Sequence, residues 1–289
     1  MSAAQASTVA RSSRGAAGRL PDFVIAGAMR SGTTSLAIHM GAHPELFMAR
    51  QKEVHFFDRH FGRGLGWYRR QFADVPAGVV AGEATPTYLS NPLAMARMAE
   101  AIPRARLIAI LRNPVDRAYS HYWMLRAMGL EERTFEQAVE AELGRSQENG
   151  GRRDLYLRPG RYLRDLLTAS SYFSRESIFV MIFEDFRDST ADAYAAACRF
   201  LCVDGSFRPP ELRRVINRYA EFRSTRIRRL FDHRSRGIIR RAVDRLNTRR
   251  RVTYPAMDAS LRAELLANFE ADNAGLERWL GRDLSAWQR

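Results

Sequence analysis

Short apolar runs, separated by longer stretches of helical periodicity, dominate the hydrophobic pattern of this 289-residue chain. An apolar run of about four to eight residues between turn-forming residues predicts a buried strand. The runs of this kind are 23–28 (FVIAGA), 79–84 (VVAGEA), 106–111 (RLIAIL) and 177–183 (SIFVMIF). Apolar residues at helical spacing predict helices over 33–42, 92–101, 115–128, 134–143, 161–173, 190–202 and 258–279, the last with Asp258 as N-cap.

Strands that alternate with helices predict an α/β fold, a parallel sheet flanked by helices on both faces. We expect residues 21–289 to form a single domain, preceded by a polar, disordered tail over residues 1–20. The tail has no apolar core of signal-peptide length, and no apolar run in the chain is long enough to span a membrane. The expected location is therefore the cytoplasm.

The net charge of +14 adds an expectation about partners, because a positive field favours anionic ligands. Arginines are densest over residues 223–251, where interleaved apolar residues predict a basic helical or loop segment within the domain. A nucleic-acid-binding or membrane-binding protein would explain this charge but not the motifs below. Cys198 and Cys202 are four residues apart, so we expect both to be buried on one helix face.

The residues after the first strand, Gly27 to Thr34 (GAMRSGTT), are typical of a phosphate-binding loop. Backbone N–H groups of such a loop and of the following helix N-terminus hold an anion. A kinase or ATPase loop has lysine directly after the second glycine, whereas this chain has Thr33. A small-metabolite kinase stays an alternative, although Arg30 is the only cation of this loop.

Two other segments carry candidate chemistry. Arg112 follows the strand 106–111, and Ser120 lies about two turns into the next helix, so a guanidinium and a hydroxyl could converge on one phosphate. The segment KEVHFFD (52–58) combines an ammonium, a carboxylate and an imidazole with two phenylalanines.

In this order along the chain, the motifs resemble those of the sulfotransferases that use 3′-phosphoadenosine 5′-phosphosulfate (PAPS). The likeness is greatest to the branch of heparan-type glucosaminyl sulfotransferases and their bacterial relatives. AGAMRSGTTSL resembles the family's 5′-phosphosulfate loop, and KEVHFFD followed by GLGWYRRQF resembles the segment with the catalytic carboxylate. GEATPTYL resembles the GE-x-TP-x-Y element, LRNPVDRAYSHY the 3′-phosphate motif, and PGRY (159–162) the glycine–aromatic element. The segment from Tyr254 to Trp287 resembles the C-terminal helix.

The resemblance implies a P-loop-like sulfotransferase fold and an enzyme of the EC 2.8.2 type. Such an enzyme moves a sulfonate from PAPS, its co-substrate, to a hydroxyl or amine by in-line transfer, without a metal. The residues it implies for PAPS binding are Arg30, Ser31, Gly32, Thr33, Thr34, Ser35, Arg112, Ser120, Tyr162, Arg250 and Arg251. Tyr162 and the arginines near 250 are expected to close over the nucleotide.

For catalysis, the resemblance implies Glu53 as the general base and Arg30 as the cation at the leaving oxygen. We expect burial beside Phe56 and Phe57 to raise the pKa of Glu53 toward neutrality. His55 is either a rival base or the residue that orients Glu53, and Lys52 is assigned to substrate or donor.

Glu83, Thr85 and Tyr88 are expected to shape the acceptor side. Two positions depart from the family pattern: Arg30 stands where many relatives have lysine, and Ala84 where the polysaccharide enzymes have lysine. The acceptor class stays open among carbohydrate, glycolipid and small metabolite. The sequence predicts no specific nucleic acid partner and leaves the oligomeric state open.

Overall fold

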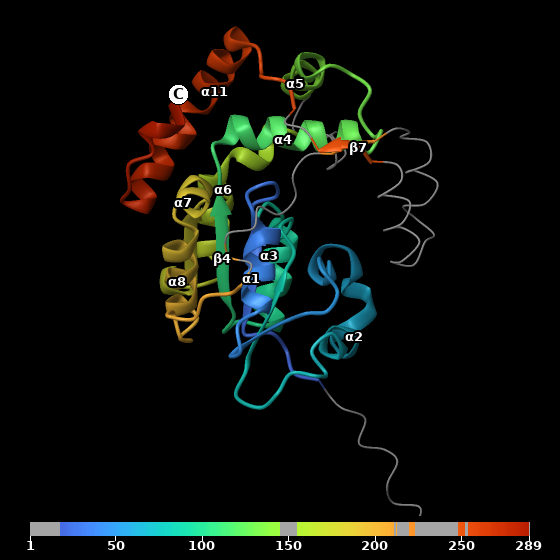
Figure 1. Cartoon of the computed structure of the whole chain (residues 1–289), viewed down its shortest axis with the longest axis vertical. Coiled ribbons are helices and arrows are strands. Elements are labelled where there is room, and N and C mark those ends of the chain that lie inside the picture. Colours follow the sequence, from blue (N-terminus) through green and yellow to red (C-terminus); the bar gives the residue numbers. More distant parts are fainter. Residues whose placement is uncertain are drawn as a thin grey trace, which may run out of the picture.

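A five-stranded parallel sheet forms the centre of the computed structural model (Figure 1). The structure describes residues 18–144, 155–210, 212, 220–222, 248–251 and 254–288, with 220–222 and 248–251 described by their backbone alone. The strands are β1 (Phe23–Gly27), β2 (Leu46–Met48), β3 (Val80–Ala84), β4 (Arg106–Leu111) and β5 (Ile178–Ile182), in the spatial order β2-β3-β1-β4-β5. The four predicted strands are confirmed. Strand β2 was not predicted, because three residues are too few to show a periodicity.

Helices cover both faces of the sheet, as the alternation of elements predicted. They are α1 (Thr33–Gly41), α2 (Gly64–Arg70), α3 (Pro92–Ala101), α4 (Pro114–Ala127), α5 (Phe135–Leu143), α6 (Tyr162–Ser170), α7 (Phe183–Asp188), α8 (Thr190–Phe200) and α11 (Ala259–Leu280). Helix α11 begins at its predicted N-cap, where Asp258 Oδ1 accepts a hydrogen bond of 2.9 Å from the Leu261 N–H. In the part of the chain that the structure describes, no helix has the length and apolar content to cross a membrane.

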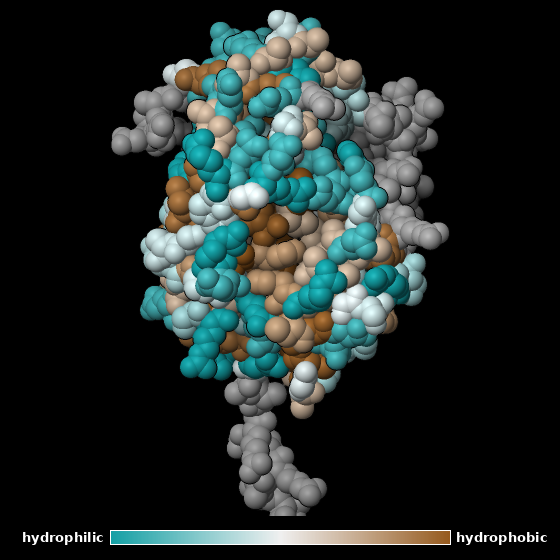
Figure 2. Space-filling view, turned by 90° about the vertical axis from the view of Figure 1, so that its left-hand side faces the viewer, coloured by the Kyte–Doolittle hydropathy of each residue, from teal (hydrophilic) through white to brown (hydrophobic). Residues whose placement is uncertain are grey.

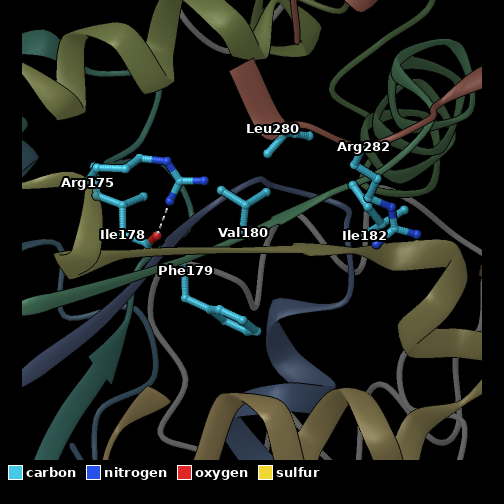
Figure 3. A pocket seen from close by; sticks show the side chains of 7 residues that line it. All are labelled: Arg175, Ile178, Phe179, Val180, Ile182, Leu280 and Arg282. Atoms are coloured by element: carbon cyan, nitrogen blue, oxygen red, sulfur yellow. Dashed lines mark hydrogen bonds between the residues drawn. The ribbon is translucent and has the colours of Figure 1, made fainter. Parts of the chain in front are cut away.

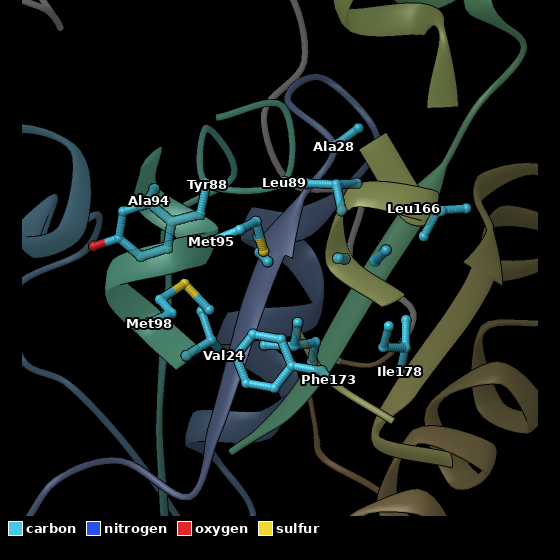
Figure 4. Close-up of a cluster of buried hydrophobic side chains, with 14 of the residues drawn as sticks. Val24, Ala28, Tyr88, Leu89, Ala94, Met95, Met98, Leu166, Phe173 and Ile178 are labelled. Atoms are coloured by element: carbon cyan, nitrogen blue, oxygen red, sulfur yellow. The ribbon is translucent and has the colours of Figure 1, made fainter. Parts of the chain in front are cut away.

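The alternating side chains of β1 build a core on each side of the sheet. Phe23 and Ile25 pack with residues of α1 and α8, whereas Val24 packs with residues of α3 and α6 (Figure 4). Strand β3 pairs with β1 at Phe23 and Gly82, where a Cβ on Gly82 would lie 2.2 Å from Phe23 Cζ. Only glycine therefore allows the large ring of Phe23 at this crossing.

A third core lies beyond the carboxyl end of β4 and joins α4, α5 and α11 (Figure 1). Its buried members include Val115 from α4, Phe135 from α5, and Leu265 and Phe269 from α11. These helices fix the chain that follows β4, which contains the predicted 3′-phosphate motif.

Several expectations about the rest of the chain need correction or lie outside the described residues. Residues 248–251 form strand β7 (Thr248–Arg251), antiparallel to β6 (Ala220–Phe222), and not a helix, whereas 223–247 lie outside the described residues. Residues 18–20, assigned to the tail, are described, and Arg19 donates to the Val79 carbonyl. Cys198 is buried as predicted, but Cys202 lies beyond the end of α8 and is exposed.

Candidate active site

The loop between β1 and α1 presents an open helix N-terminus at the carboxyl edge of the sheet. Gly32, with φ of 89°, directly precedes α1, and no side chain caps the helix or places an acid in its first turn. Ser31 is buried, and its hydroxyl has no hydrogen-bond partner among the described residues. A helix N-terminus with unsatisfied N–H groups attracts an anion. The geometry therefore agrees with the phosphate-binding loop that the sequence predicted.

Two arginines from neighbouring strand ends meet beside this loop. Arg30 Nε donates to Ser120 Oγ at 3.1 Å, and Arg112 Nη1 donates to the Arg30 carbonyl at 3.3 Å. Burial and the charge of Arg112 lower the pKa of Arg30. Within the described residues, neither arginine forms an ion pair with a carboxylate. The two positive charges repel each other, so a bound anion between them would be strongly stabilised.

Tyr162 contacts the backbone of the neighbouring Arg112 loop, and its expected place over a nucleotide stays a prediction. The side chain is buried, and its hydroxyl donates to the Arg112 carbonyl at 2.8 Å. Arg250 and Arg251, the other residues expected to close over a nucleotide, lie in β7, where the structure describes no side chains.

The predicted catalytic segment forms a chain of charged groups around His55. The ring lies between two carboxylates, with Nδ1 3.0 Å from Asp58 Oδ2 and Nε2 3.5 Å from Glu53 Oε2. Lys52 Nζ lies 3.3 Å from Glu53 Oε1, and Thr87 donates its hydroxyl to Asp58 Oδ2 at 2.7 Å. Glu53 and His55 both have positive φ, at 56° and 52°. Left-handed backbone at residues other than glycine is often found at functional sites.

The pKa of Glu53 is lowered, whereas burial was expected from the sequence to raise it. Its hydrogen bond to His55 outweighs burial and lowers the pKa of Glu53. Phe56 and Phe57 are buried in the core with Tyr68 and Tyr88, so they do not form an apolar wall around the carboxylate. Burial disfavours the protonated form of His55 and lowers its pKa. The hydrogen bonds with Asp58 and Glu53 outweigh burial and raise the pKa of His55 to about 9.

Glu83, Thr85 and Tyr88, which we expected to shape the acceptor side, are fully buried, and that role stays a prediction. Glu83 accepts hydrogen bonds from the hydroxyls of Thr85 (2.6 Å), Tyr88 (3.3 Å) and Tyr68 (2.6 Å). Burial raises the pKa of Glu83.

The same network holds the backbone of the His55 segment. The His55 N–H donates to Thr85 Oγ1 at 3.4 Å, and the Phe57 N–H donates to the Tyr88 hydroxyl at 3.3 Å. These residues therefore position the segment that carries Glu53. The sequence reasoning missed Asp58 and Thr87, although the spacing of Asp58, three residues after His55, was a usable signal.

A pocket at the outer edge of β5 contains none of the predicted site residues. Its lining consists of Arg175, Ile178, Phe179, Val180, Ile182, Leu280 and Arg282 (Figure 3). Arg175 donates to the Ile178 carbonyl, and Arg282 pairs with Asp185. The face that carries α7, α8 and α11 shows an apolar hollow within a hydrophilic rim (Figure 2). Across the described ranges, no group of three or more His, Cys, Asp or Glu side chains could hold a metal ion.

Comparison with known sequences points to one family. A profile of the sulfotransferase domain matches residues 20–249. The chain is 36% identical over 106 residues to the membrane-associated sulfotransferase kil1 of Dictyostelium discoideum, covering 36% of this chain and 22% of that protein. It is 30% identical over 200 residues to the bifunctional heparan sulfate N-deacetylase/N-sulfotransferase 2 of Bos taurus, covering 64% of this chain and 22% of the relative. The matches therefore span less than a third of these relatives.

Solved structures agree. The crystal structure of a sulfotransferase from Alicyclobacillus acidocaldarius superposes with a TM-score of 0.73 and 29% identity, covering 94% of this chain and 100% of that one. A sulfotransferase domain from the Synechococcus PCC 7002 olefin synthase shares the fold, with a TM-score of 0.51 and 17% identity over 92% of this chain and 96% of the other.

Proposed function

Because this chain belongs to the sulfotransferase domain family, we propose that it transfers a sulfonate from PAPS to a hydroxyl or amine of an acceptor. The pair of arginines beside the open N-terminus of α1 supports the proposal most directly. Arg30 and Arg112 are held together without a carboxylate partner among the described residues, so a ligand with two anionic groups would relieve their repulsion. PAPS carries such groups at its 5′ and 3′ positions.

The two anionic groups of PAPS fit two parts of this site. The 5′-phosphosulfate would lie at the N-terminus of α1, against backbone N–H groups and the hydroxyls of Ser31, Thr33, Thr34 and Ser35. The 3′-phosphate would take a charge-assisted hydrogen bond from Arg112 and a hydrogen bond from Ser120. Arg112 Nε, which is buried and without a partner among the described residues, is a ready donor.

In the proposed reaction, the acceptor oxygen or nitrogen attacks sulfur in line with the bond to the 5′-phosphate. The new bond to sulfur forms as the bond from sulfur to the phosphate oxygen breaks, and adenosine 3′,5′-bisphosphate leaves. Arg30 stabilises the negative charge that grows on that oxygen. Glu53 takes the acceptor proton. Its lowered pKa makes it a weak base, so we expect the proton to leave late, when the attacking atom has become acidic.

His55 orients Glu53 in this proposal and does not compete with it as a base. With a pKa of about 9, the imidazole is protonated at neutral pH and has no lone pair for a proton. Its contacts with Asp58 and Glu53 keep the Glu53 carboxylate in place.

For the acceptor, we propose a carbohydrate, a glycolipid or a small metabolite. The name of the Bos taurus relative refers to heparan sulfate, which supports a sugar. Ala84, however, is buried and uncharged at a position where lysine is expected for polysaccharide substrates. A small or singly charged sugar therefore fits this chain better than a sulfated polymer.

The test is a calorimetric titration of the protein with adenosine 3′,5′-bisphosphate, 5′-AMP and Mg–ATP. The proposal requires the bisphosphate to bind most tightly, and without metal, because only it reaches both anion positions. Preference for Mg–ATP would replace the proposal with a small-metabolite kinase. If none of the three binds, the basic surface would become the candidate site for an anionic macromolecule.

A further inference from the structure

The loop that carries Arg112 is tied to two distant parts of the chain through its neighbour Asn113. The Asn113 N–H donates to Glu184 Oε1 at 3.1 Å, and Asn113 Nδ2 donates to the Trp287 carbonyl at 2.8 Å. The indole Nε1 of Trp287 donates to Glu184 Oε2 at 3.2 Å, which closes a ring of three hydrogen bonds. Neither Glu184 nor Trp287 belongs to the anion site itself.

This ring leaves Asn113 little freedom to move. Its side-chain oxygen also caps α4, accepting from the N–H groups of Val115 and Asp116 at 3.0 and 3.3 Å. Asn113 and Trp287 are both buried, at 4% and 2% exposure. Buried polar groups that lose their partners cost free energy, so the ring favours a single loop conformation.

Residues 183–184 lie against both parts of the anion site, the Arg112 guanidinium and the glycine loop before α1. Phe183, which directly precedes Glu184, lies with its ring 4.9 Å from the Arg112 guanidinium. A Cβ placed on Gly32 would lie 3.1 Å from Phe183 Cδ2, so the ring packs closely against the glycine loop. A shift of residues 183–184 would therefore change the direction of the Arg112 guanidinium relative to the loop.

We infer that Trp287 and Glu184 are positioning residues for recognition of the 3′-phosphate, acting through Asn113 on Arg112. The inference rests on the proposed function, because it assumes that Arg112 binds this phosphate. A residue with this role affects ligands that carry a 3′-phosphate and leaves other nucleotides alone. A residue that serves only folding affects all nucleotides alike.

Two variants break the ring. Trp287→Phe keeps an aromatic ring but removes the indole N–H, and Glu184→Gln leaves one acceptor oxygen for the two N–H donors of Asn113 and Trp287, so one of the two hydrogen bonds is lost. Trp279→Phe is the matched control, because Trp279 contacts Arg175 and not this loop. Each protein, with the double variant, is titrated with adenosine 3′,5′-bisphosphate and with 5′-AMP, after thermal unfolding has shown that it is folded.

We expect each single variant to bind the bisphosphate about tenfold more weakly, with 5′-AMP unchanged. The double variant should bind the bisphosphate as well as the single variant with the larger loss, because both changes break the same ring of hydrogen bonds. Equal losses for both nucleotides, or unchanged bisphosphate binding in a folded variant, would overturn the inference. If the unaltered protein itself fails to prefer the bisphosphate, the proposed function fails instead.

Discussion

Arg30 and Ser120, ninety residues apart in the sequence, are joined by a 3.1 Å hydrogen bond from the guanidinium Nε to the hydroxyl. The bond links the loop after β1 to the second turn of α4, so the two predicted phosphate motifs form one site. Taken alone, neither an arginine nor a serine indicates a binding site. Their meeting at the carboxyl edge of adjacent strands gives the pair its expected role.

Replacement of Arg112 by alanine should weaken binding of adenosine 3′,5′-bisphosphate by about 1.5–3 kcal/mol, the value of one charge-assisted hydrogen bond. Binding of 5′-AMP should change little, since it has no phosphate at the 3′ position. Isothermal titration of both nucleotides measures the difference. Arg106→Ala, at the first residue of β4 and so at the opposite end of the strand that leads to Arg112, serves as the control. An equal loss for both ligands would mean that Arg112 is not specific for the 3′-phosphate.

Replacement of Glu53 by glutamine should reduce kcat by about a hundredfold or more, because the amide cannot take the acceptor proton. Binding of adenosine 3′,5′-bisphosphate should stay as it is, since Glu53 is proposed to act on the acceptor and not on the nucleotide. Steady-state kinetics with an acceptor identified by screening gives kcat, and calorimetry gives the nucleotide Kd. Glu100→Gln, on the exposed surface of α3, is the matched control. Normal turnover by Glu53→Gln would assign the base to another group.

The raised pKa of His55 predicts how stability changes with pH. A group whose pKa is higher in the folded state stabilises the protein while it is protonated in both states. This contribution is complete below about pH 6.5, the ordinary pKa of histidine, and falls as pH rises toward about 9. His55→Asn removes it. The free energy of unfolding of the native protein relative to this variant should therefore drop by about 1–2 kcal/mol between pH 6.5 and 9, because solvent screens part of the interaction that the full shift represents.

Urea denaturation at a series of pH values provides this comparison. Pairing each native measurement with the variant at the same pH cancels the titration of the other groups. A difference that stays constant from pH 6.5 to 9 would show that His55 is not held as a cation. A difference that grows with pH would indicate a neutral imidazole in the folded protein.

Periodicity sufficed for the large elements of the fold but not for the small ones. The run 106–111 and the helix 92–101 were predicted with their observed bounds, because each is a long pattern with clear ends. Strand β2 has only three residues, and its strand conformation is determined by its pairing with β3 and not by its own sequence. Helix α2 begins at Gly64, a poor helix former, and tertiary packing of Tyr68 stabilises it.

The candidate site shows a similar limit. The order of motifs predicted Arg30, Arg112 and Glu53 as site residues, which stays a prediction, and pattern alone cannot say which way a side chain points. Sequence reasoning placed Glu83 beside the acceptor but did not show that its carboxylate is buried, where Tyr68, fifteen residues away, donates to it. The pKa of Glu53 was predicted with the wrong sign, because the sequence pattern does not show that the Glu53 carboxylate lies 3.5 Å from the His55 ring.

The order of the strands divides the site into parts that can change separately over evolution. Arg30 and Arg112, assigned to the donor, follow β1 and β4, whereas the Glu53 segment is held by Thr85 and Tyr88 after β3. Substitutions in the Glu53 segment, away from positions such as Gly82 where β3 packs on β1, can therefore accumulate while Arg30 and Arg112 keep their places. Under the proposed function, a lineage with this sheet could acquire new acceptors while keeping one donor, and Ala84, which departs from the lysine of the polysaccharide enzymes, is one position at which to compare its members.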